Sequence, residues 1–234
     1  MTPDLFDSID DPDDSEPAAE TLAPGAVVLR RFARPVQADL LRDLHTVIAR
    51  APLRHLVTPG GLRMSVAMTN CGELGWVSDR RGYRYDARDP ESDESWPNMP
   101  ASFVQVAQRA AAAAGFDGFE PDACLVNRYV PGAKLSLHQD RDERDFGAPI
   151  VSVSLGLPAV FLFGGSRRAD KPARVSLRHG DVVVWGGPAR MNFHGVLPLA
   201  DGDHAVVGAQ RFNLTFRKAG PRIGPTGSIV QSIG

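Results

Sequence analysis

The stretch Arg211-Phe212-Asn213-Leu214-Thr215-Phe216-Arg217 alternates strictly between polar and apolar side chains. Side chains of a β-strand point to opposite faces in turn, so the alternation predicts a strand with one apolar and one polar face. The apolar face should pack on a core, and the polar face should line a cavity or meet solvent. A guanidinium donates paired hydrogen bonds to a carboxylate, so arginines at both ends of this polar face suit a dicarboxylate. The alternative is an exposed sheet face with solvated arginines.

A second motif, His138-Gln139-Asp140, together with the distant His194, has the residue types of a metal site. Residues two positions apart in an extended segment point to the same side, so one strand end can present His138 and Asp140 together. If His194 comes from a second strand, two imidazoles and one carboxylate leave one face of a metal open, as in non-haem Fe(II) oxygenases. An iron beside a dicarboxylate site suggests 2-oxoglutarate. The same ligands also suit zinc, and each residue alone could be structural.

The second half of the chain predicts many short strands separated by glycines. The expected strands are 26–31, 124–129, 150–156, 160–163, 175–177, 181–185 and 209–217, and the expected helices are 36–50 and 101–114. The helices should pack outside the sheets. We therefore expect a mainly β protein with flanking helices (α+β), whose core is a double-sheet jelly roll, the double-stranded β-helix, with the site in its open mouth.

Residues 53–100 lie between the two helices and are rich in Gly, Pro, Trp and Tyr. They predict loops and short hairpins outside the core, which makes them a candidate lid. The lid offers aromatic surface at Trp76, Tyr83 and Tyr85, and positive charge at Arg80, Arg81 and Arg84. Aromatics interleaved with arginines suit stacking on a nucleobase and contact with its phosphates. The alternative is that Trp76 only anchors the lid to the sheet.

Several longer stretches resemble a known family. They are VTPGG (57–61), MSVAMTNCGELGW (64–76), PDACLVNRYVPGAKLSLHQD (121–140), APIVSVSLGLP (148–158), HGDVVVWGG (179–187) and NLTFR (213–217). Motifs of this length are specific. They resemble the AlkB family, bacterial Fe(II)- and 2-oxoglutarate-dependent dioxygenases that repair alkylated DNA, over roughly residues 24–220.

The resemblance implies a role for each candidate residue. The Fe(II) ligands, which are also the catalytic centre, would be His138, Asp140 and His194. The residues that bind 2-oxoglutarate would be Asn127, Tyr129, Arg211, Asn213 and Arg217, with the arginines at its two carboxylate ends. The residues that bind the substrate would be Trp76, stacked on the damaged base against His138, Tyr83, in contact with a phosphate, and Asp142 and Arg168, in the base pocket.

The implied reaction is oxidative demethylation of 1-methyladenine and 3-methylcytosine in DNA, coupled to decarboxylation of 2-oxoglutarate with O2. Formaldehyde leaves and the base is restored. Because the methyl group lies at the pairing edge, the base must be extruded or single-stranded, so single-stranded DNA is the expected preference, with double-stranded DNA and RNA left open. Two alternatives remain at this point. One is the same oxygenase chemistry on RNA, tRNA or protein, and the other is a non-catalytic nucleic-acid-binding module.

The ends of the chain differ in composition from the middle. Residues 1–20 hold eight acids and no Lys or Arg, so the remaining residues carry 26 basic against 20 acidic side chains, a formal charge of +6. A moderately basic folded part suits a nucleic-acid partner. We expect residues 1–23 to be an acidic disordered segment, residues 24–220 to be a single oxygenase domain, and residues 221–234 to be a flexible tail.

Composition also bounds the setting of the protein. No apolar run is long enough to span a bilayer and no signal-peptide pattern opens the chain, so a cytoplasmic location without membrane contact is expected. Cys71 and Cys124 are not part of a CxxC pair, which predicts buried free thiols rather than a disulfide or a zinc site. No coiled-coil pattern is present, so we expect a monomer.

Overall fold

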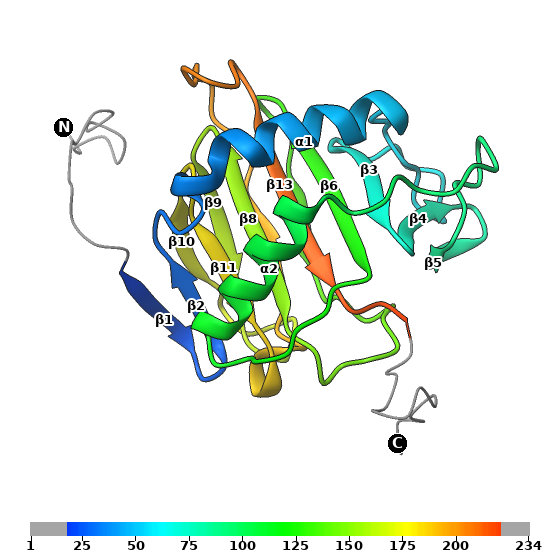
Figure 1. Cartoon of the computed structure of the whole chain (residues 1–234). Coiled ribbons are helices and arrows are strands. Elements are labelled where there is room, and N and C mark those ends of the chain that lie inside the picture. Colours follow the sequence, from blue (N-terminus) through cyan, green and yellow to red (C-terminus); the bar gives the residue numbers. More distant parts are fainter. Residues whose placement is uncertain (1–17, 221–234) are drawn as a thin grey trace.

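The computed structural model of the chain describes residues 18–220, and Figure 1 shows the arrangement of its elements. The described strands are β1 Ala19–Ala23, β2 Ala26–Leu29, β3 Ala67–Gly72, β4 Gly75–Asp79, β5 Gly82–Asp86, β6 Ala123–Tyr129, β7 Leu135–His138, β8 Ile150–Gly156, β9 Ala159–Phe163, β10 Ala173–Leu177, β11 Val182–Trp185, β12 His194–Val196 and β13 Arg211–Arg217. The helices are α1 Gln37–Arg50 and α2 Ala101–Ala113, with the 3-10 turns η1 Arg34–Val36 and η2 Gly187–Ala189.

The described strands form two large sheets and a hairpin. One sheet has seven strands in the order β1-β2-β11-β8-β13-β6-β3, the second has four in the order β10-β9-β12-β7, and β4 pairs with β5 alone. Neighbouring strands run antiparallel throughout. This double-sheet arrangement is the jelly-roll core that the sequence predicted.

The strand β13 lies in the middle of the larger sheet, between β8 and β6, and its two faces meet different partners. Its apolar side chains belong to the core under the helices, where Phe216 meets Phe103 of α2 edge to face at 5.9 Å between ring centroids. Its polar side chains point the opposite way, into the space between the two sheets, and all of them are buried. The alternation in residues 211–217 therefore separates an apolar face that packs on the core from a polar face that lines the cavity, as predicted.

Both helices cover the same face of the seven-stranded sheet (Figure 1). Leu40 and Leu44 of α1 and Phe103 of α2 are fully buried and pack against apolar residues of β8, β11 and β13. Burying side chains of this size contributes about 1.5–3 kcal/mol each to stability. The helices thus hold one face of the sheet and leave the opposite face for the site, which confirms their predicted scaffold role.

The prediction that residues 53–100 lie outside the core is wrong for β3. This strand pairs with β6 along its full length, and its first five residues are buried. The pattern was hidden by two buried polar residues. The Thr69 hydroxyl donates to the Ala51 carbonyl at 2.8 Å, and the Asn70 side chain bonds both the amide and the carbonyl of Trp76 at 3.0 Å. Local hydrogen bonds thus let polar side chains occupy core positions. The hairpin β4–β5 fits the prediction.

The prediction of disorder up to residue 23 is wrong for its last part. Strand β1 pairs with β2, and Glu20 forms an ion pair with Arg30, so the folded domain begins before residue 24. The rest of the acidic segment and the C-terminal tail lie outside the described residues. Within residues 18–220, no helix is long and apolar enough to cross a membrane. Cys71 and Cys124 are buried free thiols that face each other across β3 and β6.

His179 links the larger sheet to α1 and makes stability depend on pH. Its Nδ1 accepts a hydrogen bond from the Gly156 amide at 2.9 Å, and its Nε2 contacts the Gln37 side-chain oxygen, so the ring is held in its neutral form. Burial, and then the neighbouring His204 and Arg34, lower the pKa of His179 to about 4.

We expect the free energy of unfolding to fall as the pH drops from about 6.5 to about 4, because only the unfolded chain takes up a proton on His179 in that window. The slope from this residue is at most about 1.4 kcal/mol per pH unit. Urea unfolding at several pH values measures it. The variant His179→Asn keeps an acceptor for the Gly156 amide and should show a flatter dependence, so an equal slope in both proteins would contradict the assignment.

Candidate active site

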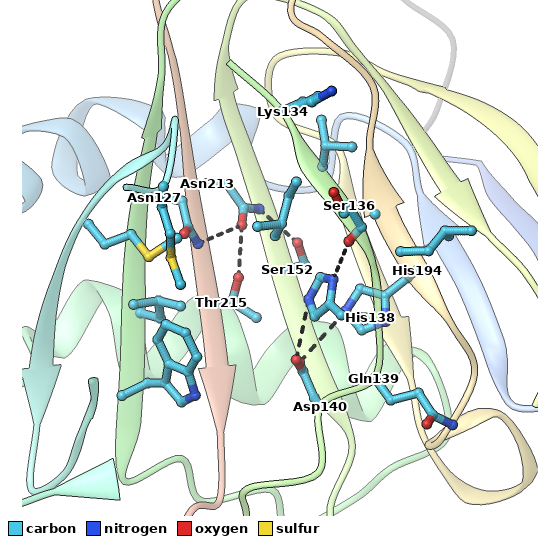
Figure 2. A pocket seen from close by; sticks show the side chains of 18 of the residues that line it. Asn127, Lys134, Ser136, His138, Gln139, Asp140, Ser152, His194, Asn213 and Thr215 are labelled. Carbon is cyan, nitrogen blue, oxygen red and sulfur yellow. Dashed lines mark hydrogen bonds and ion pairs between the residues drawn. The ribbon is translucent and has the colours of Figure 1, made fainter. Parts of the chain in front are cut away.

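A cavity of about 860 Å³ lies between the two sheets, and the β4–β5 hairpin contributes to its lining. All twelve side chains to which the family resemblance gave a role line it. Figure 2 shows how part of this set converges: the two histidines and Asp140 lie on one side, and Asn127, Asn213 and Thr215 lie on the other. Residues that are more than eighty positions apart in the chain thus meet in one chamber.

The three predicted metal ligands form a compact cluster. One ligand atom each from His138, Asp140 and His194 lies within 4.8 Å of the other two. His138 ends β7 and His194 begins β12, and these residues are direct partners across the two strands. Asp140 follows just after β7, with its carboxylate 3.6 Å from Nε2 of His138 and 3.8 Å from Nε2 of His194. The expected arrival of His194 from a second strand is therefore what the fold provides.

Backbone carbonyls orient both imidazoles toward the cluster. Nδ1 of His138 lies 2.8 Å from the Ser136 carbonyl, and Nδ1 of His194 lies 3.1 Å from the Asn192 carbonyl. A carbonyl can only accept, so each Nδ1 carries the proton and each Nε2 presents a lone pair to the cluster. Burial, and then the neighbouring His138, lower the pKa of His194 to about 3, which keeps that ring neutral. Two imidazole lone pairs and a carboxylate fit a divalent metal with an open coordination face.

Arg217 holds the carboxylate of Asp140. Its Nε and Nη2 donate to Oδ2 of Asp140 at 2.9 and 2.7 Å, and its Nε lies 3.3 Å from Glu143. Burial alone would raise the pKa of Asp140, but Arg217, followed by the two histidines, lowers it below the usual range. The carboxylate is therefore charged and fixed, which suits a metal ligand.

Arg211 contrasts with Arg217 because its guanidinium is buried without an anionic partner. The side chain is 1% exposed, and its only described hydrogen bond runs from Nη2 to the Ser154 hydroxyl at 2.8 Å. Within residues 18–220, its Nε and Nη1 have no hydrogen-bond partner. Burial lowers the pKa of Arg211 to about 10. A buried guanidinium with two vacant donors is costly alone and matches a carboxylate that accepts them, so the site fits one end of 2-oxoglutarate.

Side-chain amides and hydroxyls line the cavity between Arg211 and Arg217. Asn213 donates to the Ser152 hydroxyl at 2.7 Å and accepts from Thr215 at 2.8 Å and from Asn127 at 3.4 Å, contacts that Figure 2 marks with dashed lines. The Asn127 oxygen has no donor of its own. Tyr129 is 1% exposed, and burial raises its pKa to about 12, so its hydroxyl remains a donor. The predicted co-substrate residues therefore line one continuous polar wall.

The lid residues stand at the mouth of the cavity. The rings of Trp76 and Tyr83 stack at 5.6 Å between centroids with 12° between their planes, and the Trp76 indole donates to Asp142 at 2.8 Å. Arg168 donates to the Leu137 carbonyl at 2.9 Å and lies over the Phe193 ring. The predicted substrate residues thus gather next to the metal cluster. Trp76 also packs on a buried core cluster, so its anchoring role and a role at the mouth coexist.

Two of the lid arginines are paired within the hairpin. Arg81 and Arg84 both bind the carboxylate of Asp79, and Arg84 also lies 3.6 Å from Asp86. Contact of these arginines with a nucleic-acid backbone stays a prediction. The acids that neutralise them lie within the same hairpin, so the charge pattern of the sequence overstated the positive charge of the lid.

Sequence reasoning missed a buried ionic group that joins the lid to the metal cluster. Glu143 accepts a hydrogen bond from the Tyr85 hydroxyl at 2.8 Å and pairs with Arg190 at 3.0 Å, while Arg190 also donates to the Asp140 carbonyl at 2.8 Å. Glu143 lies three positions after Asp140, a weak signal. Nothing in the sequence around Arg190 pointed to the site.

Comparisons with known proteins agree with this geometry. Residues 25–217 match the family model described as the 2OG-Fe(II) oxygenase superfamily. The chain is 60% identical over 206 residues to the alpha-ketoglutarate-dependent dioxygenase AlkB of Salmonella typhimurium, covering 88% of this chain and 95% of that protein. It is 34% identical over 133 residues to the mouse nucleic acid dioxygenase ALKBH1, covering 56% of this chain and 34% of that protein.

A solved structure gives the same answer for the fold. The structure of OsALKBH1 superposes with a TM-score of 0.77 at 30% sequence identity, covering 86% of this chain and all of that one.

We expect the variant Arg211→Met to be at least as stable as the native protein in the absence of co-substrate, since it removes a buried charge without an ion-pair partner. The gain should lie between zero and about 4 kcal/mol. With the divalent metal present in both proteins, added 2-oxoglutarate should stabilise only the native protein, by about 2.7 kcal/mol at a hundredfold excess over the dissociation constant. Chemical unfolding with and without ligand measures both effects.

The matched control is Arg190→Met, in which a fully paired buried arginine is lost. That variant should lose about 3 kcal/mol or more. If Arg211→Met without ligand were as unstable as the control, Arg211 would stabilise the protein without ligand, contrary to its lack of an ion-pair partner.

Proposed function

Since the chain belongs to the 2OG-Fe(II) oxygenase superfamily, within the AlkB proteins, we propose that it demethylates alkylated bases in nucleic acid, with DNA as the main substrate. It is an Fe(II)- and 2-oxoglutarate-dependent dioxygenase. The proposal assigns the metal to His138, Asp140 and His194, and the distal carboxylate of 2-oxoglutarate to Arg211. The observation that carries it is that two imidazoles oriented by backbone carbonyls, a fixed carboxylate and a buried guanidinium with unpaired donors line one cavity.

The chain's own residues prepare the site for the reaction. When bound, Fe(II), 2-oxoglutarate and O2 supply the oxidising chemistry that hydroxylates the methyl group, and succinate, carbon dioxide and formaldehyde are the products. Arg217 orients the Asp140 carboxylate, and the Ser136 and Asn192 carbonyls orient the imidazoles. The polar wall formed by Asn127, Tyr129 and Asn213 positions the co-substrate between Arg211 and the metal cluster.

The mouth of the cavity supports a damaged base as the substrate. Trp76 and Tyr83 offer aromatic surface there, and the Asp142 carboxylate offers a negative charge beside it. 1-Methyladenine and 3-methylcytosine are cationic, so they are attracted both to an aromatic face and to a carboxylate. The base must leave the stack to enter, which costs least for a lesion that already weakens pairing. Arg168, at the rim, completes the proposed base pocket.

The alternative of a non-catalytic binding module no longer stands, because the chain is a member of an oxygenase family and, among residues 18–220, the buried Arg211 guanidinium pairs only with the Ser154 hydroxyl. Among oxygenase substrates, nucleic acid is favoured over protein by the aromatic mouth and by the name of the mouse relative. A preference for single-stranded DNA, a cytoplasmic location and a monomeric state form the finer part of this proposal.

The direct test incubates the protein with Fe(II), ascorbate, O2 and 2-oxoglutarate, together with single-stranded oligonucleotides that carry 1-methyladenine or 3-methylcytosine. Mass spectrometry follows the loss of the methyl group, and formaldehyde and succinate are quantified. We expect one methyl group lost per succinate. The variant Asp140→Ala should lose turnover by a factor of about a hundred or more while it largely retains DNA binding.

Two results would count against the proposal. Succinate formation without demethylation would support oxygenase activity but contradict the proposed substrate. Substantial demethylation by Asp140→Ala would contradict the proposed metal ligands.

A further inference from the structure

A second cavity, of about 420 Å³, lies beside the active-site mouth. Its lining consists of Leu74, Tyr83, Arg84, Tyr85, Asp142, Arg144, Ala219 and Gly220. The volume falls in the range of small-molecule sites, about 300–1,000 Å³. Leu74 and Ala219 give it an apolar surface, and two arginines, two tyrosines and an aspartate complete most of the rest of the lining. None of the proposed metal-binding or co-substrate-binding residues lines this cavity.

The two cavities share a wall. Tyr83, Tyr85 and Asp142 line both of them, whereas Trp76 lines only the larger one. One face of the Tyr83 ring stacks on Trp76, and the side chain is still 47% exposed. Tyr83 therefore also offers surface to the second cavity, and a ligand there would lie across the stacked Tyr83 and Trp76 rings from a base held by Trp76.

Arg144 gives the second cavity a cation that is not neutralised. Its backbone amide donates to the Ala219 carbonyl at 3.1 Å, which fixes this residue at the end of β13. Its side chain is exposed, and among residues 18–220 it has no ion pair or hydrogen bond. Arg84, the other arginine in the lining, is held by Asp79 and Asp86. Arg144 is thus the arginine of this cavity that is open to a ligand.

We propose that this cavity receives the base next to the damaged one, stacked between the Tyr83 ring and the Arg144 guanidinium. Unstacked bases of single strands are held in this way, on aromatic rings and on arginine planes. The proposal rests on the proposed function and extends it, because a base that is paired in a duplex cannot enter. The second cavity therefore favours single-stranded substrates.

The test uses trinucleotides with a central 1-methyladenine and either natural flanking bases or an abasic residue on one side. Removing the base that occupies the cavity should lower kcat/KM by about fivefold or more in the native protein, through KM, since stacking of one base is worth a factor of this size. In Arg144→Ala, removing the same base should change kcat/KM by less than about twofold, because its stacking partner is gone. Removal of the base on the other side should have a small effect in both proteins.

Two further variants separate stacking from charge. Arg144→Lys keeps the charge but loses the plane and should behave like Arg144→Ala. Arg50→Ala removes an exposed arginine from the end of α1, away from both cavities, and should keep the full effect of the flanking base.

A second readout does not depend on turnover. A trinucleotide with 2-aminopurine as the flanking base should lose fluorescence on binding to the native protein, and less so on binding to Arg144→Ala. No quenching on either side, or an equal effect of the flanking base in native protein and Arg144→Ala, would overturn the second site. Loss of all demethylation with quenching intact would instead overturn the proposed reaction. Absence of quenching while demethylation persists would overturn the second site and leave the proposed reaction standing.

Discussion

The buried polar face of β13 is the constraint on which the site depends. Two arginines on one strand are removed from water between the sheets, and each must find an anion or remain unpaired. Arg217 finds Asp140 and Glu143, which more than offset its burial, and its pKa is raised. Arg211 finds only a hydroxyl, and its pKa is lowered. The same residue type thus stabilises the protein at one end of the strand and presents unpaired buried donors at the other.

The ion pairs of Arg217 connect the metal-ligand cluster to the β4–β5 hairpin. The arginine fixes the carboxylate of Asp140, and Glu143 joins that pair to the Tyr85 hydroxyl of the β4–β5 hairpin. Such a network is rigid only when every member is satisfied, and here each charge has a partner. The β4–β5 hairpin, which lines the cavity, is therefore held by the same charges that orient Asp140, so the hairpin and the cluster of His138, Asp140 and His194 belong to one connected structure.

Much of this arrangement was visible in the sequence, and the failures have physical causes. Strict alternation in residues 211–217 predicted the strand and its two faces correctly, because one face had to be apolar. Strand β3 was missed because Thr69 and Asn70 satisfy their hydrogen bonds inside the core, which breaks the apolar pattern. The charge of the lid was overestimated because Asp79 neutralises Arg81 and Arg84 only when the hairpin forms.

The sequence by itself determined the residue types of the metal site, the two-faced strand and the jelly-roll class, since these follow from local periodicity and side-chain chemistry. Tertiary structure alone decided which charges are paired. Glu143 and Arg190 pair with each other beside the site. Arg211 keeps buried donors without a partner, and the Arg144 side chain lines a second cavity without an ion pair among residues 18–220. Pairing depends on distances of a few ångströms between segments far apart in the chain, and no local pattern encodes such distances.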